Sequence, residues 1–246
     1  LKRMLIGGSA AARTLISRLE TELSVDVIHL WGMTEMSPVG TTSQRPRHWE
    51  SMTREQQLDL KVKQGRIMWG VELKIVDDSG RTLPNDGQAF GVVKVRGPWI
   101  TKRYFRSEGG DILDEGGWFA TGDVATIDPF GYMQITDRAK DVIKSGGEWI
   151  SSIDLENAAL VHPAVQEAAV IGVAHPTWQE RPLLLVICKP GQSTTRDELL
   201  QVLASKVAKW WLPDDILFVS ELPHTATGKL NKLKLRELYQ HHKLPT

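Results

Sequence analysis

The chain has 246 residues, of which 41% are hydrophobic, so it can form one large domain or two modest ones with ordinary cores. Lys and Arg together number 30, as do Asp and Glu, which excludes a global positive field that recruits nucleic acid. The single cysteine, Cys188, excludes an intramolecular disulfide and a cysteine-rich metal site, and it fits a reducing, cytoplasmic compartment. No apolar run approaches the roughly 18 residues of a membrane-spanning helix. Because the sequence opens at Leu1 within a predicted strand, we expect a fragment of a longer protein.

The first part of the chain predicts a strand–helix–strand unit. Residues 3–6 are apolar, residues 10–23 repeat hydrophobic side chains at helical spacing, and residues 25–30 are apolar again. Such a unit normally belongs to a parallel sheet. Ligands of open α/β sheets bind at the carboxyl ends of the strands, which here is the segment 31–35.

The character of the sequence changes after Val71. Alternating runs at 73–76 and 91–95 continue through 99–100 and 132–135, with turns rich in Gly, Asp and Pro between them. These runs predict a small antiparallel sheet or barrel.

The last part of the chain predicts a small α/β domain of its own. Capping boxes at Thr53 with Gln56 and at Thr195 with Glu198 indicate helix starts, the second within this domain. The expected elements are helices at 152–161 and 195–211, strands at 168–173, 183–188 and 216–219, and a basic helix at the end.

The segment 135–150 joins the two regions. It concentrates charges in 137–144 and then carries the pair Gly146-Gly147. Charge-rich junctions are commonly solvated linkers. The apolar pair Val142-Ile143 favours a functional pivot instead.

Several polar residues have both a chemical and an ordinary interpretation. Lys229, in a glycine turn, suits a phosphate or a developing oxyanion, or is a surface lysine. Asp123, in the predicted turn 121–123, accepts hydrogen bonds from a vicinal diol such as ribose, or from its own backbone. Thr34 and Glu35 suit a phosphate oxygen and its Mg²⁺, or cap a helix.

The remaining candidates are equally open. Trp31 stacks on a base or belongs to the core, and Arg138 serves a nucleotide or a surface pair. The segment 7–9 is a glycine turn before a helix, but it lacks the full dinucleotide fingerprint.

Taken together, six segments in this order resemble the adenylate-forming, or AMP-binding, superfamily. They are GGSAA at 7–11, WGMTE at 31–35, GWFATGD at 117–123, DRAKD at 137–141, SGGE at 145–148 and TGK at 227–229. That superfamily holds acyl-CoA synthetases, luciferases and peptide-synthetase adenylation domains. Within the superfamily, the sequence is most similar to the medium-chain fatty acyl-CoA and 3-methylmercaptopropionyl-CoA ligases.

The resemblance implies a mixed α/β fold. Residues 1–137 would be the C-terminal part of a large adenylation domain, built from the strand–helix–strand unit and the small antiparallel sheet or barrel. Residues 138–246 would be a small, mobile α+β lid domain carrying the catalytic lysine. The family's Ser/Thr/Gly-rich phosphate loop and most of its acid pocket are missing from this sequence, so the resemblance covers the C-terminal half of such an enzyme.

The resemblance also implies roles for individual residues. Lys229 would stabilise charge in adenylation, Thr34 would touch the phosphate and Glu35 would position Mg²⁺. The implied nucleotide-binding residues are Gly8, Ser9, Ala10, Trp31 (where the family more often has tyrosine), Gly32, Met33, Asp123 and Arg138. Lys140 would be the hinge, and the implied CoA-binding residues are Lys144, Gly146 and Gly147.

The implied activity is an ATP-dependent carboxylic acid–CoA ligase of fatty acid metabolism, with ATP, Mg²⁺ and CoA as cofactors. Acid and ATP would give acyl-AMP and pyrophosphate, and CoA would then give acyl-CoA and AMP. Medium-chain or short fatty acids are the expected substrates, and this chain alone is expected to be inactive. The alternatives are an adenylation domain that loads a carrier protein, or a non-catalytic binding module if the natural chain is this short. Monomer and homodimer both stay open.

Overall fold

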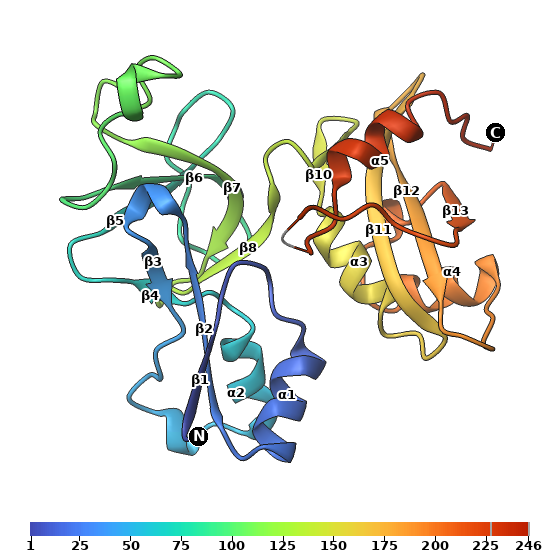
Figure 1. Ribbon diagram of the computed structural model, residues 1–246, viewed down its shortest axis with the longest axis horizontal. Helices are drawn as coiled ribbons and strands as arrows, with labels where there is room; N and C mark the ends of the chain where they lie inside the picture. The colour runs from blue at the N-terminus through green and yellow to red at the C-terminus, as the bar shows by residue number, and fades with distance from the viewer. Residues whose placement is uncertain (227, 246) are drawn as a thin grey trace. The chain divides into compact units, whose positions relative to one another are not determined.

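The computed structural model describes residues 1–226 and 228–245. The chain divides into two compact units, Leu1–Thr136 and Asp137–Thr246. Figure 1 draws the first unit from blue to green and the second from yellow to red. Among the described residues, no helix has both the length and the hydrophobicity that a membrane crossing requires.

The first unit begins with the predicted strand–helix–strand arrangement. β1 (Arg3–Ile6) pairs in parallel with β2 (Asp26–Gly32), and α1 (Arg13–Glu22) connects them. β3 (Val39–Thr42) and β4 (Arg66–Ile67) add antiparallel strands, so the sheet order is β1-β2-β3-β4. The parallel unit is therefore confirmed.

Two helices pack together beside this sheet. α2 (Arg54–Lys61) contacts α1, and a core cluster that includes Ile16, Val27 and Leu58 holds both helices against β2 (Figure 1). The predicted capping box at Thr53 is confirmed: its side chain accepts from Gln56 N, and Gln56 Oε1 accepts from Thr53 N. α1 is shorter than predicted because its N-cap residue, an alanine, has no side chain that can accept a hydrogen bond.

The second sheet of this unit is the predicted small antiparallel sheet. Its order is β5 (Glu72–Val76), β6 (Phe90–Arg96), β7 (Phe119–Ile127) and β8 (Met133–Arg138). The strand predicted at 99–100 is wrong, because Ile100 N donates to Gly97 O in a turn.

The described residues also form short 3₁₀ helices, at Thr34–Met36, Trp49–Ser51, Phe105–Ser107 and Lys209–Trp211.

The second unit is built on a five-stranded sheet. Its path is β10 (Glu148–Ile150), β9 (Ile143–Ser145), β12 (Gln179–Cys188) and β11 (Val165–His175), and β13 (Asp215–Phe218) pairs in parallel with β12. β11 and β12 form a long antiparallel hairpin. The predicted strands are confirmed. β11 extends beyond its predicted bounds at both ends, and β12 begins earlier than predicted.

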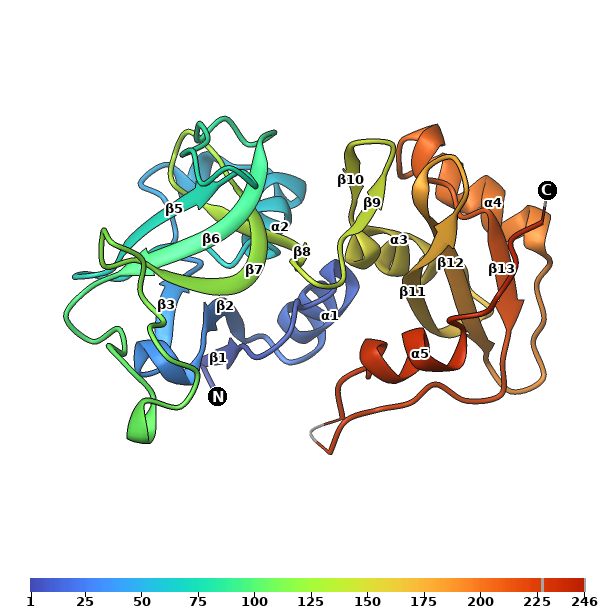
Figure 2. The same ribbon diagram turned by 90° about the horizontal axis from the view of Figure 1, so that it is seen from above.

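Alternate residues of β11 and β12 face two different cores, as the two-residue period of a strand requires. One face carries Val170 and Leu184 and is covered by α3 (Ser152–Ala159) and α4 (Arg196–Ala204). The other carries Ile171 and Leu183 and is covered by α5 (Lys232–Leu238). Figure 2 shows α3 and α5 on opposite sides of these strands.

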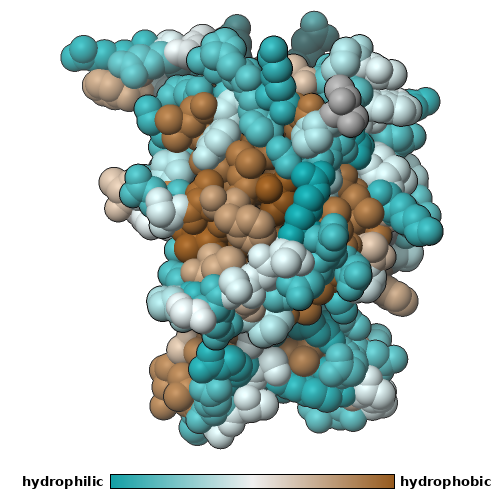
Figure 3. Space-filling view, turned by 90° about the vertical axis from the view of Figure 1, so that its right-hand side faces the viewer, coloured by the Kyte–Doolittle hydropathy of each residue, from teal (hydrophilic) through white to brown (hydrophobic). Residues whose placement is uncertain are grey.

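Figure 3 shows hydrophobic surface in the middle of one face, bordered by hydrophilic side chains.

α4 ends seven residues before its predicted end at 211. The Ser205 hydroxyl donates to Val202 O at 2.7 Å, and Lys206 N and Val207 N both donate to Leu203 O. Because a serine that bonds the preceding turn offers the backbone an alternative to the helix, the helical ladder ends there. The segment Lys209–Trp211 then forms a separate 3₁₀ turn.

Candidate functional site

Trp31 and Asp123 meet at the carboxyl end of β2. The indole N–H of Trp31 donates a 2.8 Å hydrogen bond to Oδ2 of Asp123. The two residues are 7% and 3% exposed. Because β2 and β7 belong to different sheets, this bond ties together the two sheets of the first unit. The sequence singled out both residues but gave no indication that they touch.

A β-bulge positions Asp123. The register between β6 and β7 shifts so that Val93 faces the three residues 121–123. Gly122 has φ +75°, and a Cβ there would meet nothing within 4 Å, so glycine is required for its conformation and not for space. The Thr121 hydroxyl donates to Val93 O at 3.0 Å and accepts from Asp123 N at 3.2 Å. The predicted turn at 121–123 is therefore wrong: these residues form a bulge inside β7, and the bulge redirects the side chain of Asp123.

Thr34 and Glu35 follow β2 directly, in the 3₁₀ helix Thr34–Met36. Thr34 is exposed, and Oε1 of Glu35 accepts a 2.7 Å hydrogen bond from the Tyr104 hydroxyl. That hydrogen bond raises the pKa of Tyr104 above its ordinary value. Sequence reasoning missed Tyr104, because a tyrosine in a polar loop carries no signal of a partner 69 positions earlier.

The donors at Thr34 and Glu35 would suit a hard cation such as Mg²⁺. They are a hydroxyl and a carboxylate, and Mg²⁺ is usually held by one or two carboxylates together with substrate phosphates and water. Within the described part of the chain, no group of three or more His, Cys, Asp or Glu residues could hold a metal ion. Glu35 would therefore hold Mg²⁺ only together with a bound nucleotide.

The glycine turn at 7–10 is anchored by a buried histidine. Gly8 has φ +86°, and Gly8, Ser9 and Ala10 are exposed. His29, fully buried, lies with Nε2 3.4 Å from Ala11 N and Nδ1 3.0 Å from Val62 O. Nε2 also lies 3.4 Å from Ser9 O, so the tautomer of the ring decides which of its nitrogens donates. Burial lowers the pKa of His29, an effect that the contacts with the Ser9 and Val62 carbonyls oppose.

His29 was not found from the sequence. Its position two residues before Trp31, in an otherwise apolar strand, was the available signal.

In the second unit, Lys229 lies in a tight turn with its side chain exposed. Thr225 N donates to Lys229 O at 2.7 Å, and Lys229 N donates to Thr225 Oγ1 at 3.2 Å. Gly228 has φ +79°. The turn is as predicted, although Thr227 of the same motif lies outside the described residues.

The helix that follows Lys229 is fixed by two ion pairs. Lys232 on α5 reaches Oε1 of Glu156 on α3 at 2.7 Å, and Arg236 pairs with Asp141 near the start of the unit. Burial raises the pKa of Glu156, an effect that the positive charge of Lys232 opposes. Sequence reasoning missed these pairs because their members lie 76 and 95 positions apart, with no pattern that connects them.

The junction residues are ordered within the second unit. Asp137 is 1% exposed and accepts hydrogen bonds from Ser152 N at 2.6 Å and Arg138 N at 2.7 Å. Burial raises its pKa. Asp141 N and Val142 N both donate to Arg138 O, which closes a turn around the exposed Lys140. Because Val142 is buried, this segment is not a freely solvated linker, and the hinge role of Lys140 stays a prediction.

Gly146 and Gly147 form the two-residue turn between β9 and β10, with φ +62° and +88°. Two such values suit a tight hairpin turn, in which glycine, Asn and Asp are favoured. A Cβ on Gly146 would lie 2.8 Å from the Trp178 ring, whereas one on Gly147 would meet nothing. Lys144, the middle residue of β9, donates from its backbone N to Glu180 and lies with Nζ 5.4 Å from the centre of the Trp149 ring.

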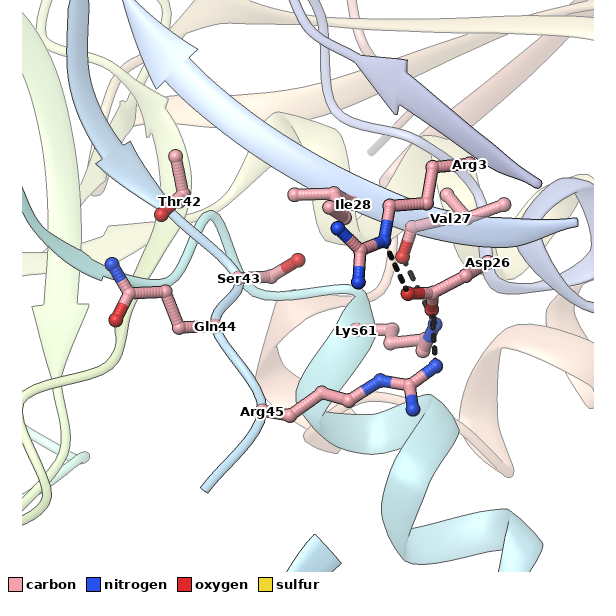
Figure 4. A pocket seen from close by; sticks show the side chains of 9 residues that line it. All are labelled: Arg3, Asp26, Val27, Ile28, Thr42, Ser43, Gln44, Arg45 and Lys61. Carbon is pink, nitrogen blue, oxygen red and sulfur yellow. Dashed lines mark hydrogen bonds and ion pairs between the residues drawn. The ribbon is translucent and has the colours of Figure 1, made fainter. Parts of the chain in front are cut away.

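A charged pocket lies at the opposite end of β2 from Trp31. Asp26 binds Lys61 at 2.6 Å and Arg45 at 2.7 Å there, with Arg3 near by (Figure 4). Its lining residues are Arg3, Asp26, Val27, Ile28, Thr42, Ser43, Gln44, Arg45 and Lys61. None of the predicted site residues lines it. Ligands of open α/β sheets bind at the carboxyl ends of strands, so we assign it no part in the candidate site.

Two family models match the chain. The model of the AMP-binding enzyme matches residues 1–105, and the model of the AMP-binding enzyme C-terminal domain matches residues 154–229. Together they account for well over half of the sequence. The chain belongs to the AMP-binding enzyme family.

Several similar proteins carry the names of CoA ligases. The 3-methylmercaptopropionyl-CoA ligase of Ruegeria pomeroyi is 52% identical over 98% of this chain and 44% of its own length. The medium-chain-fatty-acid–CoA ligase of Ectopseudomonas oleovorans is 48% identical over 97% of this chain and 44% of its own length. The chain thus spans less than half the length of these relatives.

Solved structures share the mixed α/β architecture of the chain. ATP-bound MatB from Rhodopseudomonas palustris has a TM-score of 0.82 at 28% identity, over 96% of this chain and 45% of that one. The anthranilate CoA ligase AuaEII, in complex with anthranoyl-AMP, has a TM-score of 0.81 at 32% identity, over 97% and 44%. The fold predicted from the family resemblance is therefore confirmed.

Proposed function

We propose that this chain is the C-terminal part of an ATP-dependent carboxylic acid–CoA ligase. The observation that carries the proposal is the convergence at the end of β2 of a buried carboxylate (Asp123), a hydroxyl (Thr34) and a second carboxylate (Glu35). These groups suit a ribose, a phosphate and Mg²⁺ respectively. The names of relatives, among them 3-methylmercaptopropionyl-CoA ligase, medium-chain-fatty-acid–CoA ligase and a probable acyl-activating enzyme, support the same reaction.

The first unit, in this proposal, binds the nucleotide. Asp123 accepts hydrogen bonds from the ribose hydroxyls, and the backbone of 8–10 lines the adenine, beside Trp31. Gly32 and Met33 line the path between the base and the phosphates, and Thr34 donates to a phosphate oxygen. Glu35 would hold Mg²⁺ together with the phosphates, and the ion would offset the charge on the leaving pyrophosphate.

The second unit, Asp137–Thr246, carries the remaining roles as a mobile lid. The exposed ammonium of Lys229 stabilises the negative charge that develops as the carboxylate attacks the α-phosphate. Arg138 serves the nucleotide, and Lys140 is the pivot between half-reactions. The turn at Gly146-Gly147, with Lys144 beside it, borders the pantetheine arm of CoA, because backbone without a Cβ allows close approach.

The proposed substrates are medium-chain or short acids, including short thioether acids. The names of two relatives support this choice: one is a 3-methylmercaptopropionyl-CoA ligase, and the other is a medium-chain-fatty-acid–CoA ligase. We place the enzyme in the cytoplasm. Loading of a carrier protein is the second candidate, because a carrier presents the same pantetheine arm; a homodimer is compatible with either.

The test uses the full-length protein that contains this chain. It should exchange pyrophosphate into ATP in the presence of octanoate or 3-methylmercaptopropionate, and it should release AMP and acyl-CoA when free CoA is added. Acyl transfer to a phosphopantetheinylated carrier without transfer to CoA would favour the second candidate. Residues 1–246 alone should show no exchange, and measurable exchange by them would refute the assignment of this chain as an incomplete site.

A further inference from the structure

We propose that Trp31 is a positioning residue for Asp123, and that it thereby sets the preference of the nucleotide site for ribose over deoxyribose. This inference rests on the proposed function. It starts from the 2.8 Å hydrogen bond from the Trp31 indole to Oδ2 of Asp123, formed between two buried residues 92 positions apart.

The donor cannot move freely. Trp31 lies in β2, where it pairs with Thr41 of β3. Its ring belongs to a core cluster with Met36 and Met133, and a Cβ on Gly40 would lie 2.8 Å from the ring. Because closely packed rings do not swing, the indole N–H points in one fixed direction.

The acceptor depends on that donor. Asp123 is 3% exposed, and a buried carboxylate must receive hydrogen bonds to offset its desolvation. The bulge at 121–123 sets the backbone of Asp123, and the hydrogen bond from Trp31 then fixes the rotation of its carboxylate group. Both the backbone and the indole therefore act on where the carboxylate oxygens point.

A fixed carboxylate distinguishes sugars. The two neighbouring hydroxyls of a ribose are both donors, and they can bind one carboxylate together only if its plane is held in place. A 2′-deoxyribose lacks one donor and leaves part of a desolvated acceptor without a partner. Sites built to bind a hydroxyl reject analogues without it far more strongly than apolar pockets reject a missing methylene.

The experiment compares ATP with 2′-deoxyATP in the full-length enzyme, by pyrophosphate release at saturating acid. Trp31→Phe keeps an aromatic ring but removes the N–H. We expect kcat/KM for ATP to fall by about 10- to 100-fold, the effect of losing a hydrogen bond to a charged group. The value for 2′-deoxyATP should fall much less, so that the preference for ATP collapses.

Two further variants separate positioning from packing. Tyr132→Phe removes the hydroxyl of another buried aromatic residue of the same unit, which donates to Gln44 O at 2.8 Å, and it should keep the preference for ATP. In an Asp123→Asn background, Trp31→Phe should add little, because residues that act through one contact are not additive.

An unchanged ratio of ATP to 2′-deoxyATP in Trp31→Phe would overturn the inference, and so would equal losses for both nucleotides. Full additivity with Asp123→Asn would do the same. The proposed function fails by a different result: a wild-type enzyme that releases no pyrophosphate with any acid tested.

Discussion

Lys232 on α5 and Glu156 on α3 form a 2.7 Å ion pair in which the side chains are only 11% and 12% exposed. Glu156 also accepts from Val170 N of β11 at 2.8 Å, so α3, α5 and the central hairpin meet at one carboxylate. Lys232 lies three residues beyond Lys229. The base of the loop that carries the proposed catalytic lysine is therefore attached to the core of its unit.

Lys232→Ala should destabilise the second unit strongly. The substitution leaves Glu156 buried without its counter-charge, which typically costs about 3–5 kcal/mol. The double variant Lys232→Met with Glu156→Gln should cost less, because the carboxylate that Lys232 pairs with loses its charge as well. Denaturant unfolding of wild type and both variants measures the difference, and equal losses in the two variants would contradict a buried ion pair.

His29 gives the first unit a pH-dependent stability. Burial lowers its pKa in the folded state, so the unfolded chain takes up a proton first as the pH falls below the ordinary value of about 6.5. Stability should therefore be lost as the pH falls from about 7 to 5, and it should be unaffected by this residue above pH 7. His29→Gln removes the titration.

The measurement is the change in unfolding free energy between pH 7 and pH 5 in wild type and His29→Gln. The variant should show the smaller change. A matched control is His241→Gln, at an exposed position near the end of the chain, which should keep the wild-type pH dependence. Identical profiles for wild type and His29→Gln would show that His29 does not resist protonation.

Local patterns predicted the elements of this fold well. The hydrophobic periodicity of α1 and β2 and the capping boxes at Thr53 and Thr195 depend on residues a few positions apart, and all are confirmed. The errors were also local, since nothing in the sequence distinguishes the bulge at 121–123 from a turn. Both place a glycine at positive φ beside an aspartate.

Contacts within the site were not predictable in the same way. Trp31 and Asp123 were each selected for their chemistry, yet their hydrogen bond depends on how two sheets pack. His29, Tyr104, Glu156 and Lys232 were missed because each acts through a partner distant in sequence. Single-sequence patterns carry spacing along the chain, whereas these interactions are set by tertiary structure.

Asp154, near the start of α3, should titrate in an unusual range. Burial, with a contribution from Asp137, raises the pKa of its carboxyl group to about 6, against the opposing hydrogen bond of Ser151. The unfolded chain therefore loses this proton first, and stability should fall as the pH rises from about 4 to 6 and stay level above that.

Asp154→Asn should remove this loss. Because the residue is partly exposed, we expect a gain of about 1–2 kcal/mol at pH 7 and none at pH 4. Carbon NMR of the aspartate carboxyl groups gives the pKa directly. A midpoint near 4 for Asp154, or a variant whose gain does not change with pH, would contradict the proposed environment.

Lys229→Ala should separate the two half-reactions of the proposed enzyme. The exposed ammonium in its tight turn is expected to act on the charge around the α-phosphate and not on thioester formation. Removing one such stabilising group typically lowers the rate by about 100- to 1000-fold, so pyrophosphate exchange should fall by that order. Transfer to CoA from supplied acyl-adenylate should stay within a few-fold of wild type. Lys234→Ala, on the exposed side of α5, is the matched control and should leave both rates unchanged. Equal losses in the two half-reactions of Lys229→Ala would remove this lysine from the adenylation step.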